Sequence, residues 1–160
     1  MRRKEREVTD VTEIKEILQK AEVLRIALNN GTYPYVLPVN FGFEMNGEDL
    51  MLFFHGSKDG TKHEVIERDP HVTFEVDCGH MLMQPLGEES CTSSFAYESV
   101  IGQGTIEKAD ESEKEKLLTS LLAHYNIEAK AFNPMHLSNT VIYKIHAISY
   151  TAKRRVNDRV

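Results

Sequence analysis

A short loop that carries glycines, hydroxyls and lysines is the segment of this sequence best suited to chemistry. It spans residues 56–62, Gly-Ser-Lys-Asp-Gly-Thr-Lys, between the apolar run 50–54 and a helix-like segment that opens near Thr61. A helix N-terminus has unpaired N–H groups and a partial positive charge, to which a lysine adds a full charge. The loop therefore suits a phosphate group, with Lys62 as the strongest candidate ligand. Hydroxyl and backbone groups that could assist come from Gly56, Ser57, Gly60 and Thr61.

The same loop also has a plainer interpretation. It contains neither the GxxxxGK[ST] pattern of a Walker loop nor the GxGxxG pattern of a dinucleotide fold. On local sequence alone, an ordinary strand-to-helix connection with Thr61 as the N-cap is favoured over a phosphate site. The two interpretations have to be separated by the segments around the loop.

Three other segments hold candidate groups. His55 ends the apolar run and could donate a proton or anchor a substrate, although isolated histidines are more often structural. The segment 33–41 contains Pro38, which leaves main-chain groups free for a flat, hydrogen-bonding ligand; an ordinary edge strand is the alternative. The segment 93–102 brings hydroxyls that could reach a phosphate or a polyol chain, and alone it is uninformative.

Composition argues against several other classes of protein. The 160 residues, 41% hydrophobic and 28% charged, predict a single domain over residues 1–160. The net charge of −6 argues against a nucleic-acid binder, and no apolar run approaches the ~20 residues of a membrane span. No signal peptide is visible, and two cysteines, Cys78 and Cys91, indicate free thiols in a cytoplasmic protein. Seven scattered histidines without a CxxC motif argue against zinc, and no GxSxG elbow supports a serine nucleophile.

The order of elements predicts an antiparallel barrel with peripheral helices. Hydrophobic periodicity indicates helices over 10–21, 61–68 and 110–125, the first opening on an Asp10–Glu13 capping box. Strands are expected over 23–28, 35–43, 50–55, 71–77, 95–107 and 141–153, with a long loop over 78–93. Turn residues separate the strands and no regular βαβ alternation occurs, which favours a barrel over a doubly wound sheet.

Four segments follow one another in an order and spacing more specific than any of them alone. They are VLPVNFGF at 36–43, LFFHGSKDGTK at 52–62, RDPHVTFEV at 68–76 and YESVIGQG at 97–104. Together they resemble the flavin-binding split-barrel proteins related to pyridoxamine 5′-phosphate oxidase. Within that family the sequence is most similar to the 5-nitroimidazole-resistance (Nim) subgroup, and the resemblance runs from about residue 2 to residue 155.

The resemblance implies a six-stranded antiparallel split β-barrel, mainly β, that forms a homodimer with FMN in a cleft at the subunit interface. By motif, the flavin ring would lie along Leu37, Pro38, Val39 and Asn40. The flavin edge and ribityl chain would be followed by Phe54 and His55, and the phosphate would be surrounded by Gly56, Ser57, Lys58 and Lys62. Tyr97 and Ser99 would approach the cofactor, often from the partner subunit.

The resemblance also implies a function, an FMN-dependent oxidoreductase or nitroreductase acting on a small-molecule acceptor. His55 matches the Nim histidine near the flavin and would orient or protonate the acceptor. A non-catalytic flavin-binding or sensor protein is the alternative, and a barrel that has changed ligand to haem or a deazaflavin is a third hypothesis. Pro34 and Val39 stand where the true oxidase has basic residues, and its C-terminal arginine motif is not recognisable. These departures argue against pyridoxamine 5′-phosphate oxidase activity itself.

Overall fold

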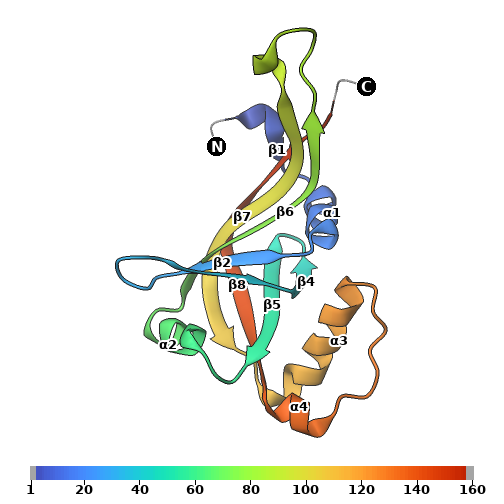
Figure 1. Cartoon of the computed structure of the whole chain (residues 1–160). Coiled ribbons are helices and arrows are strands. Elements are labelled where there is room, and N and C mark those ends of the chain that lie inside the picture. Colours follow the sequence, from blue (N-terminus) through green and yellow to red (C-terminus); the bar gives the residue numbers. More distant parts are fainter. Residues whose placement is uncertain (1–2, 158–160) are drawn as a thin grey trace.

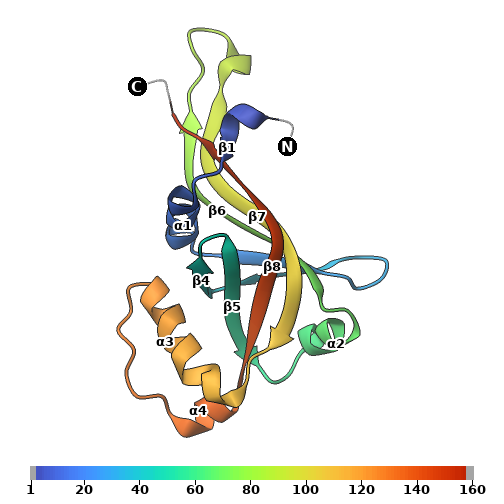
Figure 2. The same cartoon turned by 180° about the vertical axis from the view of Figure 1, so that it is seen from behind.

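The computed structural model describes residues 3–157, and its centre is one curved antiparallel sheet (Figures 1 and 2). The strands are β1 (Glu7–Val8), β2 (Leu24–Leu28), β3 (Tyr35–Val39), β4 (Phe41–Asn46), β5 (Asp49–Ser57), β6 (His71–Met83), β7 (Ser94–Lys108) and β8 (Thr140–Arg155). The α-helices are α1 (Val11–Lys20), α2 (Thr61–Arg68), α3 (Lys114–His124) and α4 (Pro134–Ser138). Short 3-10 helices are η1 (Lys4–Arg6), η2 (Ser90–Thr92) and η3 (Glu111–Glu113). The predicted mainly β, antiparallel fold with peripheral helices is confirmed.

The barrel is split at Asn40. The strand order is β3-β2-β6-β7-β8-β5-β4, so the two edge strands, β3 and β4, are consecutive in the chain and separated by this one residue. Pro38 lies on the edge strand β3, as its missing N–H predicts. The single strand expected over 35–43 is wrong, because the chain passes at Asn40 from one edge of the open sheet to the other. This break, together with β1 on β8, gives eight strands where six were predicted.

Local signals fix several elements near the open edge. Asp10 caps α1, accepting hydrogen bonds from the N–H groups of Thr12 (2.8 Å) and Glu13 (3.1 Å). The reciprocal half of the predicted capping box is wrong, because the Glu13 carboxylate pairs with Arg154 on β8 instead. The β4–β5 hairpin turns at Gly47, whose φ of +59° suits glycine.

The β6–β7 arm corrects the long loop predicted over 78–93. β6 continues to Met83 and pairs with β7 as far as the Met83–Ser94 pair, with a register shift between Cys78 and Met81. The two strands extend together beyond the rest of the barrel (Figure 1). Gly102 on β7 permits a close approach of its neighbours, since a Cβ there would lie 2.3 Å from the Phe74 ring and 2.7 Å from the Ser149 carbonyl oxygen.

Two apolar clusters hold the fold together. The larger one fills the barrel interior and includes Phe54, and α1 contributes Ile14, Ile17 and Leu18 to it. The smaller one joins α3 to the outer face of β5 and β8 through Phe53, Leu117, Leu121 and Ile142. Successive residues of a strand face opposite sides, so β5 sends Phe54 inward and Phe53 outward. His55 therefore follows on the outer face, at the end where β5 leaves the barrel.

Candidate functional site

A hollow of about 330 Å³ opens at the split of the barrel. It is lined by Val23, Pro38, Val39, Asn40 and His55. The register explains this grouping: β4 begins with Phe41 opposite Phe54, so Asn40 and His55 meet just beyond the end of the pairing. Pro38 and Val39 arrive from the other edge of the sheet, which pairs with β2. The structure thus brings four of the predicted site residues together.

His55 is the titratable group of this hollow. Its side chain reaches solvent, yet partial burial lowers the pKa of the imidazole below its ordinary value. At neutral pH the ring is therefore uncharged, with one nitrogen as a donor and the other as an acceptor. It can orient a ligand by hydrogen bonding, and it is poorly suited to act as a permanent cation.

The loop after His55 folds back on itself around Lys62. The Lys62 Nζ donates a hydrogen bond to the Asp59 carbonyl oxygen at 2.8 Å, and the Ser57 hydroxyl accepts one from the Asp59 N–H at 3.3 Å. Gly56 leaves room for this lysine, since a Cβ there would lie 2.8 Å from the Lys62 Cε. The cation therefore closes the loop through a backbone carbonyl and has no carboxylate partner among residues 3–157.

Gly60 is the N-cap of helix α2, so the assignment of the N-cap to Thr61 is wrong. Gly60 has a φ of +120° and provides no side-chain cap for the helix. Helix α2 spans the eight residues Thr61–Arg68, as predicted, and its first turn lies beside the Lys62 ammonium. Uncapped N–H groups and a cation at one place are an arrangement that attracts an anion.

Two residues that sequence reasoning missed connect this loop to the core. His63 Nε2 lies 2.8 Å from the Ser57 carbonyl oxygen, and its Nδ1 lies 2.5 Å from the Tyr143 hydroxyl. Tyr143 is fully buried on β8 and stacks on Phe54 with ring centroids 5.4 Å apart. No local sequence pattern predicts this contact, because His63 and Tyr143 are 80 residues apart in the chain.

Tyr125, at the end of α3, braces the other side of the hollow. Its hydroxyl accepts a hydrogen bond from the Phe41 N–H at 3.0 Å and donates one to the Glu22 carbonyl oxygen at 2.8 Å. These bonds join the first residue of β4 to the segment just before Val23. The Tyr125 hydroxyl therefore joins the two walls of the hollow.

Other predicted residues lie differently. Gly56, Ser57 and Lys62 follow His55 directly in space, and Lys58 is exposed in the same loop. Leu37 is half-buried against the barrel core and Phe54 is fully buried within it, and neither side chain lines the hollow.

Tyr97 and Ser99 do not join the loop within one chain. They pair with Arg155 and Lys153 near the end of β8, whereas Ser57 pairs with Thr140 at its beginning. Tyr97 is half-buried in a separate hollow with Glu98 and Arg154, and Ser99 is only 8% exposed.

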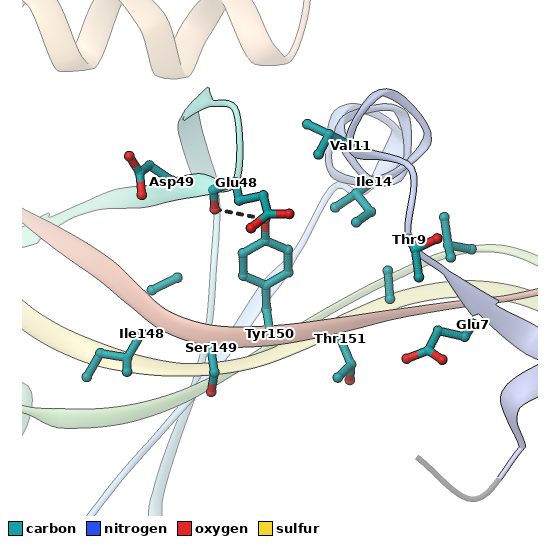
Figure 3. Close-up of a pocket in the computed structure, with 13 residues that line it drawn as sticks. Glu7, Thr9, Val11, Ile14, Glu48, Asp49, Ile148, Ser149, Tyr150 and Thr151 are labelled. Atoms are coloured by element: carbon teal, nitrogen blue, oxygen red, sulfur yellow. Dashed lines mark hydrogen bonds between the residues drawn. The ribbon is translucent and has the colours of Figure 1, made fainter.

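A second hollow, of about 450 Å³, lies between β1, α1, the β4–β5 turn and β8 (Figure 3). The Tyr150 hydroxyl crosses it to donate a hydrogen bond to the Glu48 carbonyl oxygen at 2.8 Å. The carboxylates of Glu7, Glu48 and Asp49 line it, and none of the predicted site residues does. Its negative charge makes it unsuited to a phosphate.

Cysteine and metal chemistry find little support in residues 3–157. Both cysteines are free; Cys78 is buried and Cys91 is exposed. Burial, followed by the charge of Glu98, raises the pKa of the Cys78 thiol to about 11, so it stays protonated. Within this part of the chain no three histidine, cysteine or acidic side chains are grouped to hold a metal ion, and no helix is long and apolar enough to cross a membrane.

Comparison with known proteins gives consistent matches. A sequence profile described as pyridoxamine 5′-phosphate oxidase matches residues 10–154, and no curated protein matches the chain in sequence. A candidate 5-nitroimidazole antibiotic resistance protein from Bacteroides thetaiotaomicron superposes with a TM-score of 0.77 at 26% identity, over 92% of this chain and 85% of that one. The FAD and heme binding protein from Mycobacterium smegmatis has a TM-score of 0.76 at 20% identity, over 95% and 74% of the two chains. The flavocytochrome Anf3 from Azotobacter vinelandii has a TM-score of 0.74 at 18% identity, over 94% and 70%; these last two share the fold.

Proposed function

The chain belongs to the pyridoxamine 5′-phosphate oxidase family, and from this premise we propose that it binds flavin mononucleotide (FMN) at the split of its barrel. The observation that carries the proposal is the continuity of two subsites along β5. His55 lines the hollow with Pro38 and Asn40, and two residues later Ser57 opens the loop that carries Lys62. A flat ring joined to a phosphate by a short chain matches this pair of subsites.

Each part of the site has a distinct task in this proposal. The α2 N-terminus and Lys62 bind the phosphate, Lys62 exchanging its contact with the Asp59 carbonyl for a charge-assisted bond. Pro38 and Asn40 lie along the ring edge, where the main chain of β3 has no strand beside it. When bound, the flavin supplies hydride or electron transfer. The neutral His55 orients the acceptor by a hydrogen bond.

The reaction class we propose is FMN-dependent reduction of a small acceptor, with nitro compounds as the first class to test. The 26% identity over most of the chain to a candidate 5-nitroimidazole resistance protein supports this choice. Pyridoxamine 5′-phosphate oxidation is not part of the proposal, because Val39 and Pro34 supply no basic group at the ring strand.

We propose that the protein acts as a homodimer in the cytoplasm. Apolar side chains stand exposed on the arm and on the outer sheet face, among them Met81, Leu82, Phe95, Ile101 and Ile148. Burying such a patch against a second copy would remove it from water. In that arrangement Tyr97, far from Lys62 in its own chain, contributes to the cofactor site of the partner. The two free cysteines support a reducing compartment.

A non-catalytic flavin binder is the second candidate, and one observation favours it. His55 is the only titratable side chain among the five residues that line the hollow, so no charged acid stands ready for an acceptor. Anaerobic mixing of the FMN-loaded protein with NADH or NADPH and a nitroaromatic compound separates the two. Multiple turnovers would exclude a passive binder, whereas a flavin that is never reoxidised by the acceptor would favour it.

The binding proposal is tested by spectroscopy on the purified full-length chain. We expect a flavin absorption spectrum, or its appearance when FMN is added to cofactor-free protein. FAD, deazaflavin and haem should be titrated in parallel, because two structural neighbours are described as binding FAD and heme or as a flavocytochrome. A colourless protein that does not take up FMN would overturn the proposal, and a Soret band would replace it with haem binding.

A further inference from the structure

We propose that His63 is a positioning residue, which locks the phosphate loop to the barrel core and thereby gives the site its preference for a phosphorylated flavin. This inference rests on the proposed FMN binding. His63 has no place in the ligand set derived from the sequence, and it follows Lys62 directly in the first turn of α2. Its imidazole connects the end of β5 and the start of α2 to the core residue Tyr143.

The hydrogen bonds define the tautomer of the neutral His63 ring. The Ser57 carbonyl oxygen can only accept, so His63 Nε2, 2.8 Å away, must carry a proton. In the neutral imidazole Nδ1 is then an acceptor, and the Tyr143 hydroxyl at 2.5 Å donates to it. Burial, with a smaller contribution from Glu67, raises the pKa of Tyr143 to about 12, so the hydroxyl keeps its proton.

Tyr143 connects this chain of bonds to the buried core of the barrel. It is fully buried, it pairs with Phe54 between β8 and β5, and the two rings are stacked at an angle of 24°. The His63 ring also lies against Tyr143, with centroids 5.7 Å apart. An imidazole held in this way has little freedom, and it transmits that restriction to the Ser57 carbonyl.

The loop beyond Ser57 depends on this attachment. The Ser57 hydroxyl receives the Asp59 N–H, and the Asp59 carbonyl receives the Lys62 ammonium. Both ends of the loop are thus set by one side chain, since His63 holds Ser57 and neighbours Lys62 in the chain. A loop that is already ordered binds a phosphate without the entropy loss that a mobile loop would incur.

The effect should be restricted to the phosphate. The hollow at the split is lined by Val23, Pro38 and Asn40, and Tyr125 joins its walls. The hydrogen bonds of His63 go instead to Ser57 and Tyr143. Loss of the His63 bonds should therefore weaken FMN and leave riboflavin, which has the same ring without phosphate, almost unaffected. A residue that merely supports folding would weaken both ligands together.

The test compares the dissociation constants of FMN and riboflavin for cofactor-free wild type, His63→Ala, His63→Gln and Tyr143→Phe. We expect His63→Ala to weaken FMN by about tenfold or more and riboflavin by less than about twofold. Gln keeps a donor and an acceptor, so His63→Gln should restore much of the preference, and Tyr143→Phe should fall between. His136→Ala removes an exposed histidine on α4 and should change neither ligand.

The outcomes separate this inference from the function on which it rests. Wild type that binds neither ligand would overturn the proposed function. Wild type that prefers FMN, with His63→Ala and Tyr143→Phe retaining the full preference, would overturn the role of His63 alone. Melting temperatures identify a variant that fails to fold. If His63→Ala fails to fold, unaltered selectivity for FMN in Tyr143→Phe decides against the inference. Reduced selectivity in Tyr143→Phe, together with nearly normal selectivity in His63→Gln, supports it.

Discussion

The two ends of β8 hold charged groups in opposite situations. At its beginning, beside Ser57, the Lys62 ammonium contacts only a backbone carbonyl in an exposed loop. Near its end, Arg154 is paired with Glu98 and Glu13, and Glu98 is paired again with Lys20. The side chains of Glu98 and Arg154 are 13% and 22% exposed, so this second group is largely withdrawn from water.

The difference supports the proposal that the beginning of β8 lies beside an anion site and that its end stabilises the fold. Partial burial alone would raise the pKa of Glu98, but hydrogen bonds from Arg154 and Lys20 hold it below its ordinary value, so its charge is already compensated. An incoming anion would have to displace these partners. At Lys62 an anion has only to replace one neutral acceptor, and the helix N-terminus adds its own attraction. We therefore expect variants at the two ends to separate stability from binding.

The largest effect on stability should come from breaking the ion pairs of Arg154 near the end of β8. We expect Arg154→Ala to lower the free energy of unfolding by about 2–3 kcal/mol, because it leaves the Glu98 carboxylate partly buried with one partner fewer. FMN affinity per folded molecule should be unchanged if each cofactor site lies within one chain, and reduced if the neighbouring Tyr97 serves the partner's site. Urea unfolding and flavin titration measure the two quantities.

Two controls sharpen this prediction. Arg155→Ala removes a neighbouring cation that makes no ion pair found among residues 3–157, and it should change stability by less than about 0.5 kcal/mol. The double change Glu98→Gln with Arg154→Met should cost less than Arg154→Ala, since it leaves no unpaired charge. Equal losses in Arg154→Ala and Arg155→Ala would contradict the assignment of this cluster to stability.

At Lys62, beside the beginning of β8, we expect a change to affect FMN binding. Lys62→Ala is expected to weaken FMN by about 1.5–3 kcal/mol, the value of a charge-assisted phosphate contact, while riboflavin binding and melting temperature stay nearly constant. Lys15→Ala is the control and should leave FMN affinity unchanged, because this lysine is exposed on α1, outside the loop. Titration by flavin fluorescence provides the measurement. Unchanged FMN affinity in Lys62→Ala would show that the phosphate is bound elsewhere.

A variant of Tyr125 tests whether ligand binding in the hollow depends on the hydrogen bonds of the Tyr125 hydroxyl. Tyr125→Phe removes the hydroxyl that joins the Phe41 N–H to the Glu22 carbonyl, and it should cost about 1–2 kcal/mol of stability. Riboflavin and FMN should weaken to the same extent, in contrast to Lys62→Ala. Tyr33→Phe, at a side chain 78% exposed, should leave both quantities unchanged. A loss of FMN binding alone would contradict a role in shaping the ring site.

Elements with a local cause could be predicted from the sequence. Helix 61–68 ends at Asp69-Pro70, where proline disfavours the helical conformation of the residue before it, and its bounds are those observed. The strand break at Asn40 has no local cause, since it arises where the chain crosses between the two edges of the sheet. The arm was missed because residues 79–82 are exposed on both strand faces, so no alternation marks them.

The candidate site divides in the same way. The loop around Lys62 and the position of His55 were visible, because glycines, hydroxyls and cations are adjacent in the sequence. His63 and Tyr125 were not visible as site residues, because their partners are 80 and 84 residues away and no local pattern encodes such pairs. The cofactor roles of Tyr97 and Ser99 stay predictions, and the burial of Ser99 within its own chain makes Tyr97 the better residue to test.

The smallest effect concerns two histidines whose protonation is disfavoured by burial. His124 is buried at the end of α3, and His55 lines the open hollow. His124 lies between the rings of Phe41 and Tyr125, and burial lowers its pKa despite a hydrogen bond to the Ala21 carbonyl at 2.9 Å. The unfolded chain, with an ordinary histidine pKa of about 6.5, then takes up a proton more readily than the folded one. Stability from His124 is therefore fully present above pH 6.5 and decreases as the pH falls below it.

We expect wild-type unfolding free energy to fall between pH 7 and pH 5, and the His124→Gln variant to show a shallower fall. Gln keeps a donor for the Ala21 carbonyl without titrating, so its cost at pH 7 should stay below about 1 kcal/mol. The pKa of His55 is lowered in the same direction, but this ring lines the open hollow, so His55→Gln should chiefly change the pH dependence of acceptor turnover. Urea unfolding at several pH values, paired with anaerobic assays, separates the two. We assign His124 to stability and His55 to acceptor turnover. If His55→Gln removed the loss of stability at acid pH and His124→Gln did not, these two assignments would be reversed.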